Sequence, residues 1–258
     1  STLGGATRSS DGAAFTAHHN IAIGHEAGKS VTSGTNNVII GHQAGDAMTT
    51  AGFHVFVGAY AGGSMTTSGL GAVGVGYNAY AATTTHGRGT AIGAYALQSV
   101  NHTQDDYNVA VGYRAGYNQT TAENNTFLGA RAGEAVTGAS NVIIGREAGV
   151  AMTSGADCVI IGHSAAAANN TRNGLVIIGS GAGASLTSGD ANTFVGGGAG
   201  RNVSSGDHNT LLGYHAGYDL VAASSHNTLI GKEAGANINV TGDGNNIHLG
   251  ISGFTALS

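Results

Sequence analysis

The stretch NVIIGHQAGDAMTTAG, residues 37–52, decides the fold, because variants of it fill most of the chain. NIAIGHEAGKSVTSG precedes it at residues 20–34, and NVIIGREAGVAMTSG and NTFVGGGAGRNVSSG follow at 141–155 and 192–206. Self-similarity at a fixed period is the mark of a repeat architecture, in which each unit buries its apolar face against the next. The sequence therefore predicts an array of similar units.

Each unit is aligned here on the glycine that ends its aliphatic run, which we call the anchor glycine. Successive anchor glycines are 16 to 19 residues apart, most often 17. The anchor glycines are Gly24, Gly41, Gly58, Gly76, Gly93, Gly112, Gly129, Gly145, Gly162, Gly179, Gly196, Gly213, Gly231 and Gly250.

Composition excludes several classes of protein. The 258 residues include 46 Gly and no Pro, and Gly has no period of three, so the chain is not a collagen. No apolar run is long enough for a membrane-spanning helix, so we expect no membrane insertion. The net charge of -5 with no basic patch argues against a nucleic-acid partner. The single Cys158 permits no internal disulfide, and no cofactor motif is present.

The residues around each anchor glycine predict a short β-strand followed by a turn. The residues one and three positions before the anchor are β-branched or Leu, which favours strands. Glycines recur every few residues, and each destabilises a helix by about 1 kcal/mol. We therefore expect an all-β fold: a β-solenoid or β-roll rod of about 14 rungs, stacked ~4.8 Å apart along ~60 Å.

Other columns of the repeat add to this picture. Ala three residues after the anchor and an apolar residue seven after it are expected to fill the core. Asn recurs four residues before the anchor, and stacked Asn side chains are expected to hydrogen-bond along the rod. These residues are Asn20, Asn37, Asn108, Asn125, Asn141, Asn192, Asn209, Asn227 and Asn246.

The residue two positions before the anchor is expected to point away from the core, because neighbouring strand residues face opposite sides. This column is nevertheless rich in large apolar residues, and an exposed stripe of that kind requires a cover. The alternative is burial of both strand faces inside one chain. We predict a parallel homotrimer, intertwined or side by side, whose interface contains Ile39, Phe56, Phe127, Ile143, Ile160, Ile177, Phe194, Leu211, Leu229 and His248.

Three regions follow from the repeat. Residues 1–19 are expected to form an N-terminal partial rung or connection, 20–250 the repeat rod, and 251–258 a C-terminal tip segment. Within the rod, 71–108 is irregular, and we expect a local thickening, kink or protruding loop there, since Ala79-Tyr80 and Ala96-Leu97 replace the usual Ala-Gly.

The units NTFVGGGAG, NTLLGYHAG and NTLIGKEAG resemble the glycine-rich repeats of bacteriophage tail fibres and related adhesins. They are also similar to the β-roll heads of trimeric autotransporter adhesins, whose units are typically shorter. The ending NIHLGISGFTALS resembles the segment before the self-cleaving chaperone of endosialidase-type phage fibres, which implies that Ser258 is a cleavage end. The resemblance implies an extracellular trimeric fibre on a virion, together with other tail fibre proteins.

Polar and aromatic side chains gather one and two residues after the anchor. They are either a solvated edge that keeps the rod soluble or a recognition stripe for sugars, which bind to aromatic faces flanked by hydrogen-bonding groups. The best clusters for a ligand are Tyr113, Arg114 and Tyr117, and Tyr214, His215 and Tyr218.

Metal binding and catalysis have weaker support. The sequence has no HxH or HExxH spacing, and Asp105-Asp106 lacks an Asp-rich calcium repeat. Three copies of His248 meeting on a trimer axis remain an alternative metal or anion site. The acidic residues are scattered and form no carboxylate pair of the glycosidase type, so we expect no enzymatic activity.

The sequence therefore predicts a receptor-binding fibre that attaches a phage to a bacterial surface polysaccharide or outer-membrane protein. The alternative is a bacterial trimeric surface adhesin, or a structural filament, with no phage role. Ice or mineral binding is a weaker alternative, because no regular Thr-x-Thr array lies on the strands.

Overall fold

A computed structural model describes residues 17–67, 71–85, 87–101, 106–168, 171–220, 225–236 and 245–251. This part of the chain is all-β, with fourteen strands of three residues and no helix that could cross a membrane. The strands are β1 (Ile21–Ile23), β2 (Val38–Ile40), β3 (Val55–Val57), β4 (Val73–Val75), β5 (Thr90–Ile92), β6 (Val109–Val111), β7 (Thr126–Leu128), β8 (Val142–Ile144), β9 (Val159–Ile161), β10 (Val176–Ile178), β11 (Thr193–Val195), β12 (Thr210–Leu212), β13 (Thr228–Ile230) and β14 (Ile247–Leu249). The predicted β-solenoid with a period of about 17 residues is confirmed.

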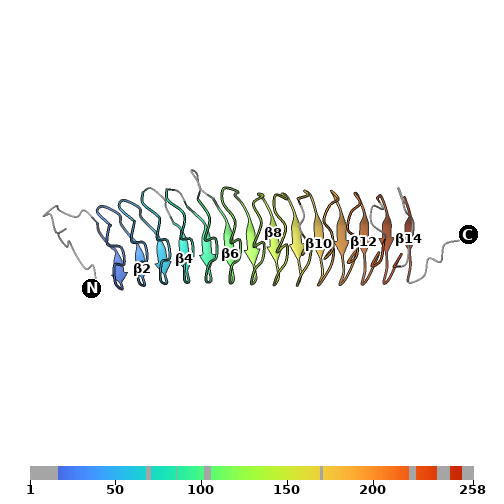
Figure 1. Ribbon diagram of the computed structural model, residues 1–258, viewed down its shortest axis with the longest axis horizontal. Coiled ribbons are helices and arrows are strands. Elements are labelled where there is room, and N and C mark those ends of the chain that lie inside the picture. Colours follow the sequence, from blue (N-terminus) through green and yellow to red (C-terminus); the bar gives the residue numbers. More distant parts are fainter. Residues whose placement is uncertain are drawn as a thin grey trace, which may run out of the picture. The chain divides into compact units, whose positions relative to one another are not determined.

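The chain divides into two units, Ser1–Asn125 and Thr126–Ser258, called unit 1 and unit 2 below. In unit 1, β1 to β6 pair in chain order as a parallel sheet without any shift of register. Val38 pairs with Val55 and Ile39 with Phe56, for example. The strands of the unit lie along one side of the coil, and the rest of each turn forms the other side (Figure 1).

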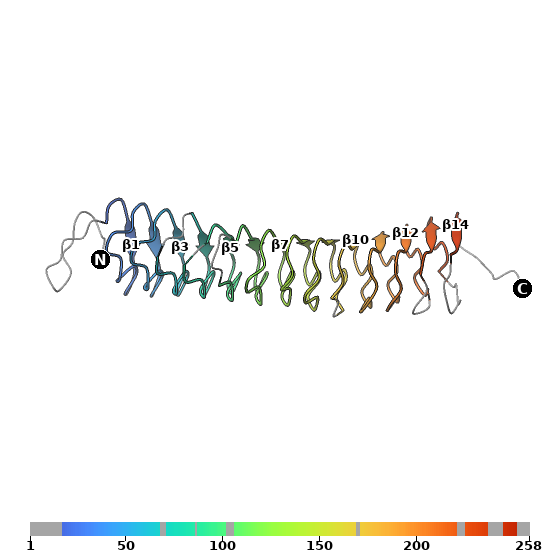
Figure 2. The same cartoon turned by 90° about the horizontal axis from the view of Figure 1, so that it is seen from above.

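Unit 2 repeats this arrangement with β7 to β14, which also pair in chain order and in parallel. Within the unit, successive turns of the coil stack one behind the other with their strands on the same side (Figure 2). Each unit is therefore a solenoid with a single sheet, made of one short strand per turn.

The anchor glycines permit this close stacking. Gly41 has a φ of 136°, and a Cβ atom built on it would lie 2.5 Å from the carbonyl carbon of Gly58 in the next turn. No other residue fits in so little space with that backbone conformation. The repeat period is thus fixed by backbone contacts from one turn to the next.

The prediction about the two faces of the strand was wrong. The middle residue of each strand, two before the anchor, is buried inside the coil of its own chain: Ile39, Phe56 and Ile160 are all 0% exposed. The first and last strand residues point outward instead and are half-buried or exposed, as the burial of β2, β3 and β9 shows.

The proposed trimer interface is corrected accordingly. Ile39, Phe56, Phe127, Ile143, Ile160, Ile177, Phe194, Leu211 and Leu229 are core residues of one chain and have no exposed area to offer a partner. His248 occupies the same middle position in β14, where it is half-buried. The alternative of burial within one chain therefore holds for this column, and these nine side chains do not form a trimer interface.

Large and small residues alternate across this core. A Cβ atom on Gly62 would lie 2.4 Å from the Phe56 ring, so this Gly, four after its anchor, leaves room for the Phe. In the next turn the sizes are exchanged: the middle strand residue is Gly74, and the residue four after the anchor is Tyr80, which is fully buried. Such compensation keeps the core close to the density of protein interiors.

The same exchange explains the irregular segment 71–108. Leu97, which also stands in a Gly position, is buried beside turns whose middle strand residues are Ala91 and Ala110. The register is kept throughout, because β4 pairs with β5 and β5 with β6 as elsewhere. The extra residues at 102–105 lie outside the described residues, as do 1–16 and 252–258 of the two predicted terminal segments.

The predicted Asn ladder is confirmed. In unit 2, the Oδ1 atom of Asn209 accepts hydrogen bonds from the backbone N–H and the side-chain amide of Asn227, at 3.0 and 2.9 Å. In unit 1, the Oδ1 atom of Asn20 accepts the corresponding pair from Asn37, at 2.9 and 3.0 Å. The ladder gives hydrogen-bond acceptors to buried backbone N–H groups. A buried N–H group without an acceptor would destabilise the fold.

His54 and Cys158 replace Asn in this ladder. The backbone N–H of Ala72 donates to Nδ1 of His54 at 3.2 Å. The thiol of Cys158 donates to the carbonyl oxygen of Ala156 at 3.2 Å, and burial raises the pKa of this thiol. The backbone N–H groups of His54 and Cys158 still donate to Oδ1 of Asn37 and of Asn141, so both residues stand in the ladder without an Asn side chain.

The Ala column and the apolar column seven after the anchor are also buried as predicted, as Ala44, Met48, Met65 and Met152 show. Among the described residues, the second segment of each turn forms no assigned strand, although its backbone is bonded between turns. Thr32 N–H donates to the carbonyl oxygen of Thr49 at 2.9 Å, for instance.

Candidate functional site

The polar and aromatic side chains one, two and five residues after the anchor lie on the turn that follows each strand. We call this turn surface the edge. Its backbone is fixed from turn to turn: the N–H of Tyr60 donates to the carbonyl oxygen of His42 at 2.9 Å, and that of Tyr95 to Tyr77 at 2.8 Å. Tyr60 and Tyr95 have positive φ angles of 60° and 62°, so this stacking holds a conformation that non-glycine residues rarely adopt.

The edge of unit 1 carries an unbroken row of aromatic rings, which we call the aromatic ladder: His25, His42, Tyr60, Tyr77, Tyr95 and Tyr113. Neighbouring ring centroids are 5.2 to 6.1 Å apart. The two imidazoles are parallel, and each later pair meets edge to face, which is a favourable geometry for aromatic rings.

The rings of the ladder reach solvent. Tyr60, Tyr77 and Tyr113 are 37%, 44% and 49% exposed. Exposed aromatic rings held on a rigid backbone lose little conformational entropy when a ligand stacks on them. The ladder therefore offers apolar ring faces with hydroxyl and imidazole groups at a spacing set by the solenoid.

A hollow of about 260 Å³ lies at one end of the ladder. It is lined by Tyr95, Tyr113, Arg114 and Tyr117. The guanidinium carbon of Arg114 is 4.3 Å from the centre of the Tyr117 ring, and Tyr117 lies 6.3 Å from Tyr95. Burial among these side chains raises the pKa of Tyr95 from its ordinary value of 10.0. Its hydroxyl, like that of any Tyr at neutral pH, is protonated and can donate a hydrogen bond. The hollow thus combines ring faces, phenol donors and a positive charge.

A smaller aromatic cluster lies on the edge of unit 2. The rings of Tyr214 and His215 are stacked with centroids 3.9 Å apart, and His215 lies 4.4 Å from Tyr218. The His215 ring packs on the backbone of Gly198, where a Cβ atom would lie only 2.5 Å from it. Tyr214 is 53% exposed, so its ring is accessible to a ligand.

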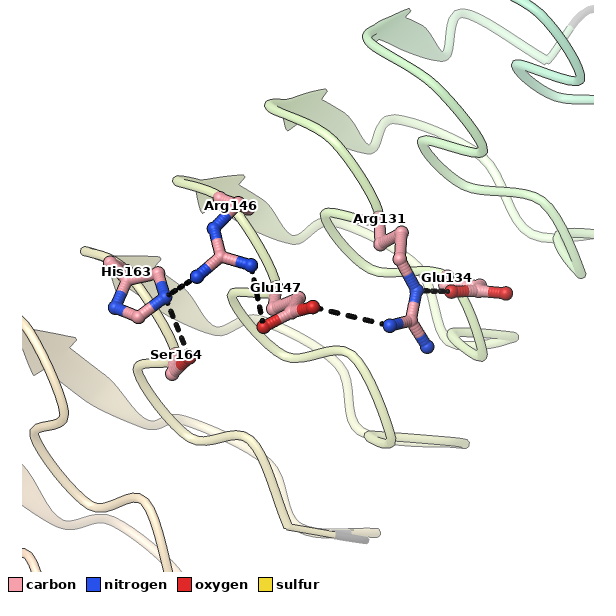
Figure 3. A network of polar contacts seen from close by, with 6 residues as sticks. All are labelled: Arg131, Glu134, Arg146, Glu147, His163 and Ser164. Atoms are coloured by element: carbon pink, nitrogen blue, oxygen red, sulfur yellow. Dashed lines mark hydrogen bonds and ion pairs between the residues drawn. The ribbon is translucent and has the colours of Figure 1, made fainter.

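Elsewhere on the edge of unit 2, charged residues neutralise one another (Figure 3). Arg131 contacts Glu134 at 2.5 Å and Glu147 at 3.2 Å, and Arg146 contacts Glu147 at 3.3 Å and also bonds to His163. The Glu134 carboxylate raises the pKa of the Arg131 guanidinium. This segment of the edge fits the solvated-edge interpretation.

A second charged group lies near the start of unit 1. Gln43 and Lys29 both donate hydrogen bonds to Oε2 of Glu26, at 2.6 and 2.9 Å. These bonds, with that of Gln43 contributing most, lower the pKa of Glu26 from 4.5 to about 2. The carboxylate is therefore ionised at neutral pH.

The structure brings together both predicted ligand clusters, Tyr113 with Arg114 and Tyr117, and Tyr214 with His215 and Tyr218. The repeat pattern predicted a stripe of polar and aromatic residues that includes Tyr60, Tyr77 and Tyr95, but not that their rings contact one another as a continuous ladder. These rings alternate between the first and second positions after the anchor, so they form no single column. An aromatic residue at either position in six successive turns was the available signal.

Metal binding gains no support from the geometry. Within the described ranges, no three His, Cys, Asp or Glu side chains come together in a way that would hold a metal ion. His248 lies in the column that faces the inside of its own coil, so the basis for placing three copies of it on a trimer axis is removed. Asp105 lies outside the described residues, and Asp106 is buried against Tyr80.

The fold defines a parallel β-solenoid with an aromatic edge. Comparisons with protein-family models, with curated proteins and with solved structures yield no match for this chain.

Proposed function

We propose that this chain is a non-catalytic attachment protein that binds a polysaccharide through the aromatic ladder of unit 1. The observation that supports this most is the row of six rings from His25 to Tyr113, which ends in the hollow beside Arg114. Sugar rings stack their C–H faces on aromatic rings and hydrogen-bond at their rims, and the ladder supplies both kinds of group. A polymer that repeats along its length engages several rings at once, which raises its avidity.

The biological role that we propose is that of a receptor-binding segment of a bacteriophage tail fibre. In this role the chain is extracellular on the virion and contacts a bacterial surface polysaccharide, beside other tail fibre proteins. The resemblance of the repeat supports this role, and so does a rigid scaffold that presents one edge repeatedly. A bacterial surface adhesin that uses the same ladder is the second candidate.

The binding proposal is tested by titrating the full chain with bacterial capsular and O-antigen polysaccharides and following Tyr fluorescence, since the chain has no Trp. We expect at least one polysaccharide to bind, and Tyr60→Ala and Tyr77→Ala each to raise Kd about tenfold, which corresponds to ~1.4 kcal/mol.

Phe53→Ala is the matched control, because Phe53 is also an exposed aromatic residue, at 58%, but lies outside the ladder. Its Kd is expected to stay within about twofold of the wild type, since single exposed apolar residues away from a site contribute little. Equal losses in the ladder variants and in the control would refute the ladder as the binding surface.

A further inference from the structure

The outward side of the sheet carries no charged residue in any described strand. The first and last residues of β1 to β6 are eleven Val or Ile and Thr90. Those of β7 to β14 are twelve Val, Ile or Leu and four Thr. We call these two columns of side chains the outer face. The edge of the same chain, by contrast, carries polar, aromatic and charged side chains in most turns, so the edge and the outer face differ clearly in polarity.

These aliphatic side chains are accessible to solvent in the single chain. Ile23 and Ile92 in unit 1 are 47% and 40% exposed, and Leu128 and Leu212 in unit 2 are 45% and 43% exposed. Val159 and Ile161 in β9 are half-buried. The outer face is thus an apolar surface, although each of its strands is only three residues long.

The outer face is large enough to be an interaction site. Three strand residues span about 10 Å, and turns are ~4.8 Å apart, so each strand presents about 50 Å² in projection. The six strands of unit 1 then present roughly 300 Å² and the eight of unit 2 roughly 400 Å², in the range where apolar patches mark interaction sites.

The flatness and the side-chain spacing of the outer face indicate which partner fits it. Flat faces of β-branched side chains pack against each other at about 10 Å, as in β-sandwiches. The side chains of β8, β9 and β10 repeat at the strand spacing, so a partner must present side chains at the same interval. A second copy of this chain has that interval and the same uncharged surface, and an interface between identical faces is self-complementary.

We propose that copies of this chain associate through the outer face, with Val, Ile and Leu side chains of facing sheets packed against one another. This interface replaces the one that the sequence placed on the middle strand residues. It is independent of the proposed polysaccharide binding, because the edge and the outer face use different side chains.

Light scattering on the purified full chain tests the proposal. We expect a mass of two or three times 25.3 kDa, the larger value being the predicted homotrimer. The variant Ile144→Lys/Ile178→Lys places two charges on the outer face, two turns apart, and is expected to have the mass of one chain with an unchanged β circular dichroism spectrum.

The control Ser180→Lys/Ser185→Lys adds the same charge at exposed positions away from the outer face and is expected to keep the wild-type mass. If the first Lys variant does not fold, Ile144→Thr/Ile178→Thr replaces it, since Thr already occurs on this face at Thr193 and Thr210. We expect this variant to weaken association at least tenfold. A monomeric wild type, or an outer-face variant that folds and keeps the full mass and association constant, would overturn the proposal.

Discussion

The hydroxyl of Tyr80 donates a hydrogen bond to the carboxylate of Asp106, and both side chains are fully buried in unit 1. Tyr80 stands where most turns have Gly. Gly87 and Gly89 leave the room that its side chain requires, because Cβ atoms built on them would lie 2.5 Å from the Tyr80 hydroxyl oxygen and 2.9 Å from its ring. Burial is the main cause that raises the pKa of Tyr80 far above its ordinary value of 10.0, and the charge of Asp106 adds to it. The core of this irregular segment therefore contains a buried polar pair, Tyr80 and Asp106.

This pair makes the stability of unit 1 sensitive to alkali. Above pH 10 the unfolded chain loses the Tyr80 proton while the folded chain keeps it, so the free energy of unfolding falls as pH rises. Tyr80→Phe is expected to remove part of this slope, but to lower stability at pH 8 by about 1–3 kcal/mol because Asp106 loses a donor. Urea unfolding at pH 8 and pH 11 measures both effects. Tyr113→Phe, at an exposed position, is the control, and identical slopes for the two variants would contradict the account.

The exchange of large and small core residues predicts unequal effects of two Gly→Ala substitutions in unit 2. Gly133 and Gly174 have similar φ angles of 57° and 66°. A Cβ atom on Gly133 would lie 2.3 Å from the Phe127 ring, whereas nothing lies within 4 Å of one on Gly174. Both variants are strained by about 1 kcal/mol in the backbone, and Gly133→Ala is destabilised by a further ~1–3 kcal/mol from overpacking.

Denaturant unfolding followed by circular dichroism measures this difference. The pair is matched in backbone conformation, so the Phe127 contact is the variable that separates them. If the two midpoints agree within error, the core packing described for Phe127 is incorrect.

The Asn ladder predicts that a buried member contributes more than an exposed Asn. Asn209→Ala removes the acceptor of two hydrogen bonds from Asn227 and leaves a buried backbone N–H without that partner. We expect a loss of about 1–3 kcal/mol in unfolding free energy. Asn202→Ala removes only an exposed bond to Asp219 and is expected to cost less than ~0.5 kcal/mol. A larger loss for Asn202→Ala would show that the ladder does not stabilise the coil.

The hydrogen bonds to Glu26 predict that the stability of the fold decreases at acidic pH. The folded chain holds the pKa of Glu26 at about 2, below the ordinary 4.5, so these contacts stabilise the fold above pH 4.5 and that contribution is lost as pH falls from 4.5 to 2. NMR titration of the Glu26 carboxyl carbon measures the midpoint directly. Gln43→Ala removes the largest cause and is expected to shift the midpoint upward. A wild-type midpoint at 4.5 would refute the bonds from Gln43 and Lys29.

The repeat architecture was predictable because the anchor glycines impose their spacing on every turn. Which strand residues face the core was not predictable. Strands such as Val142–Ile144 are aliphatic at all three positions, so their sequence shows no difference between core and surface. One signal was present: the middle residue varies from Phe56 to Gly74 while a residue of opposite size appears at Gly62 or Tyr80. Paired changes of volume indicate contact inside a core, whereas uniform size along a column does not.

The edge was predictable only in part for a related reason. The clusters around Tyr113 and Tyr214 are local in sequence, so their motifs could be recognised. The ladder through Tyr60, Tyr77 and Tyr95 depends on how successive turns superimpose. Backbone hydrogen bonds between turns set that superposition, and the sequence of a single repeat unit does not show them.

The central claim is that the middle strand residues form the core and the outer residues do not. The most direct measurement compares Ile160→Asp with Ile161→Asp, two neighbours in β9 of which only Ile160 is fully buried. Circular dichroism and urea unfolding are expected to show that Ile160→Asp abolishes the cooperative fold, because a buried unpaired carboxylate is strongly unfavourable. Ile161→Asp is expected to keep the β spectrum and a cooperative transition. A folded Ile160→Asp beside an unfolded Ile161→Asp would contradict the assignment of the faces.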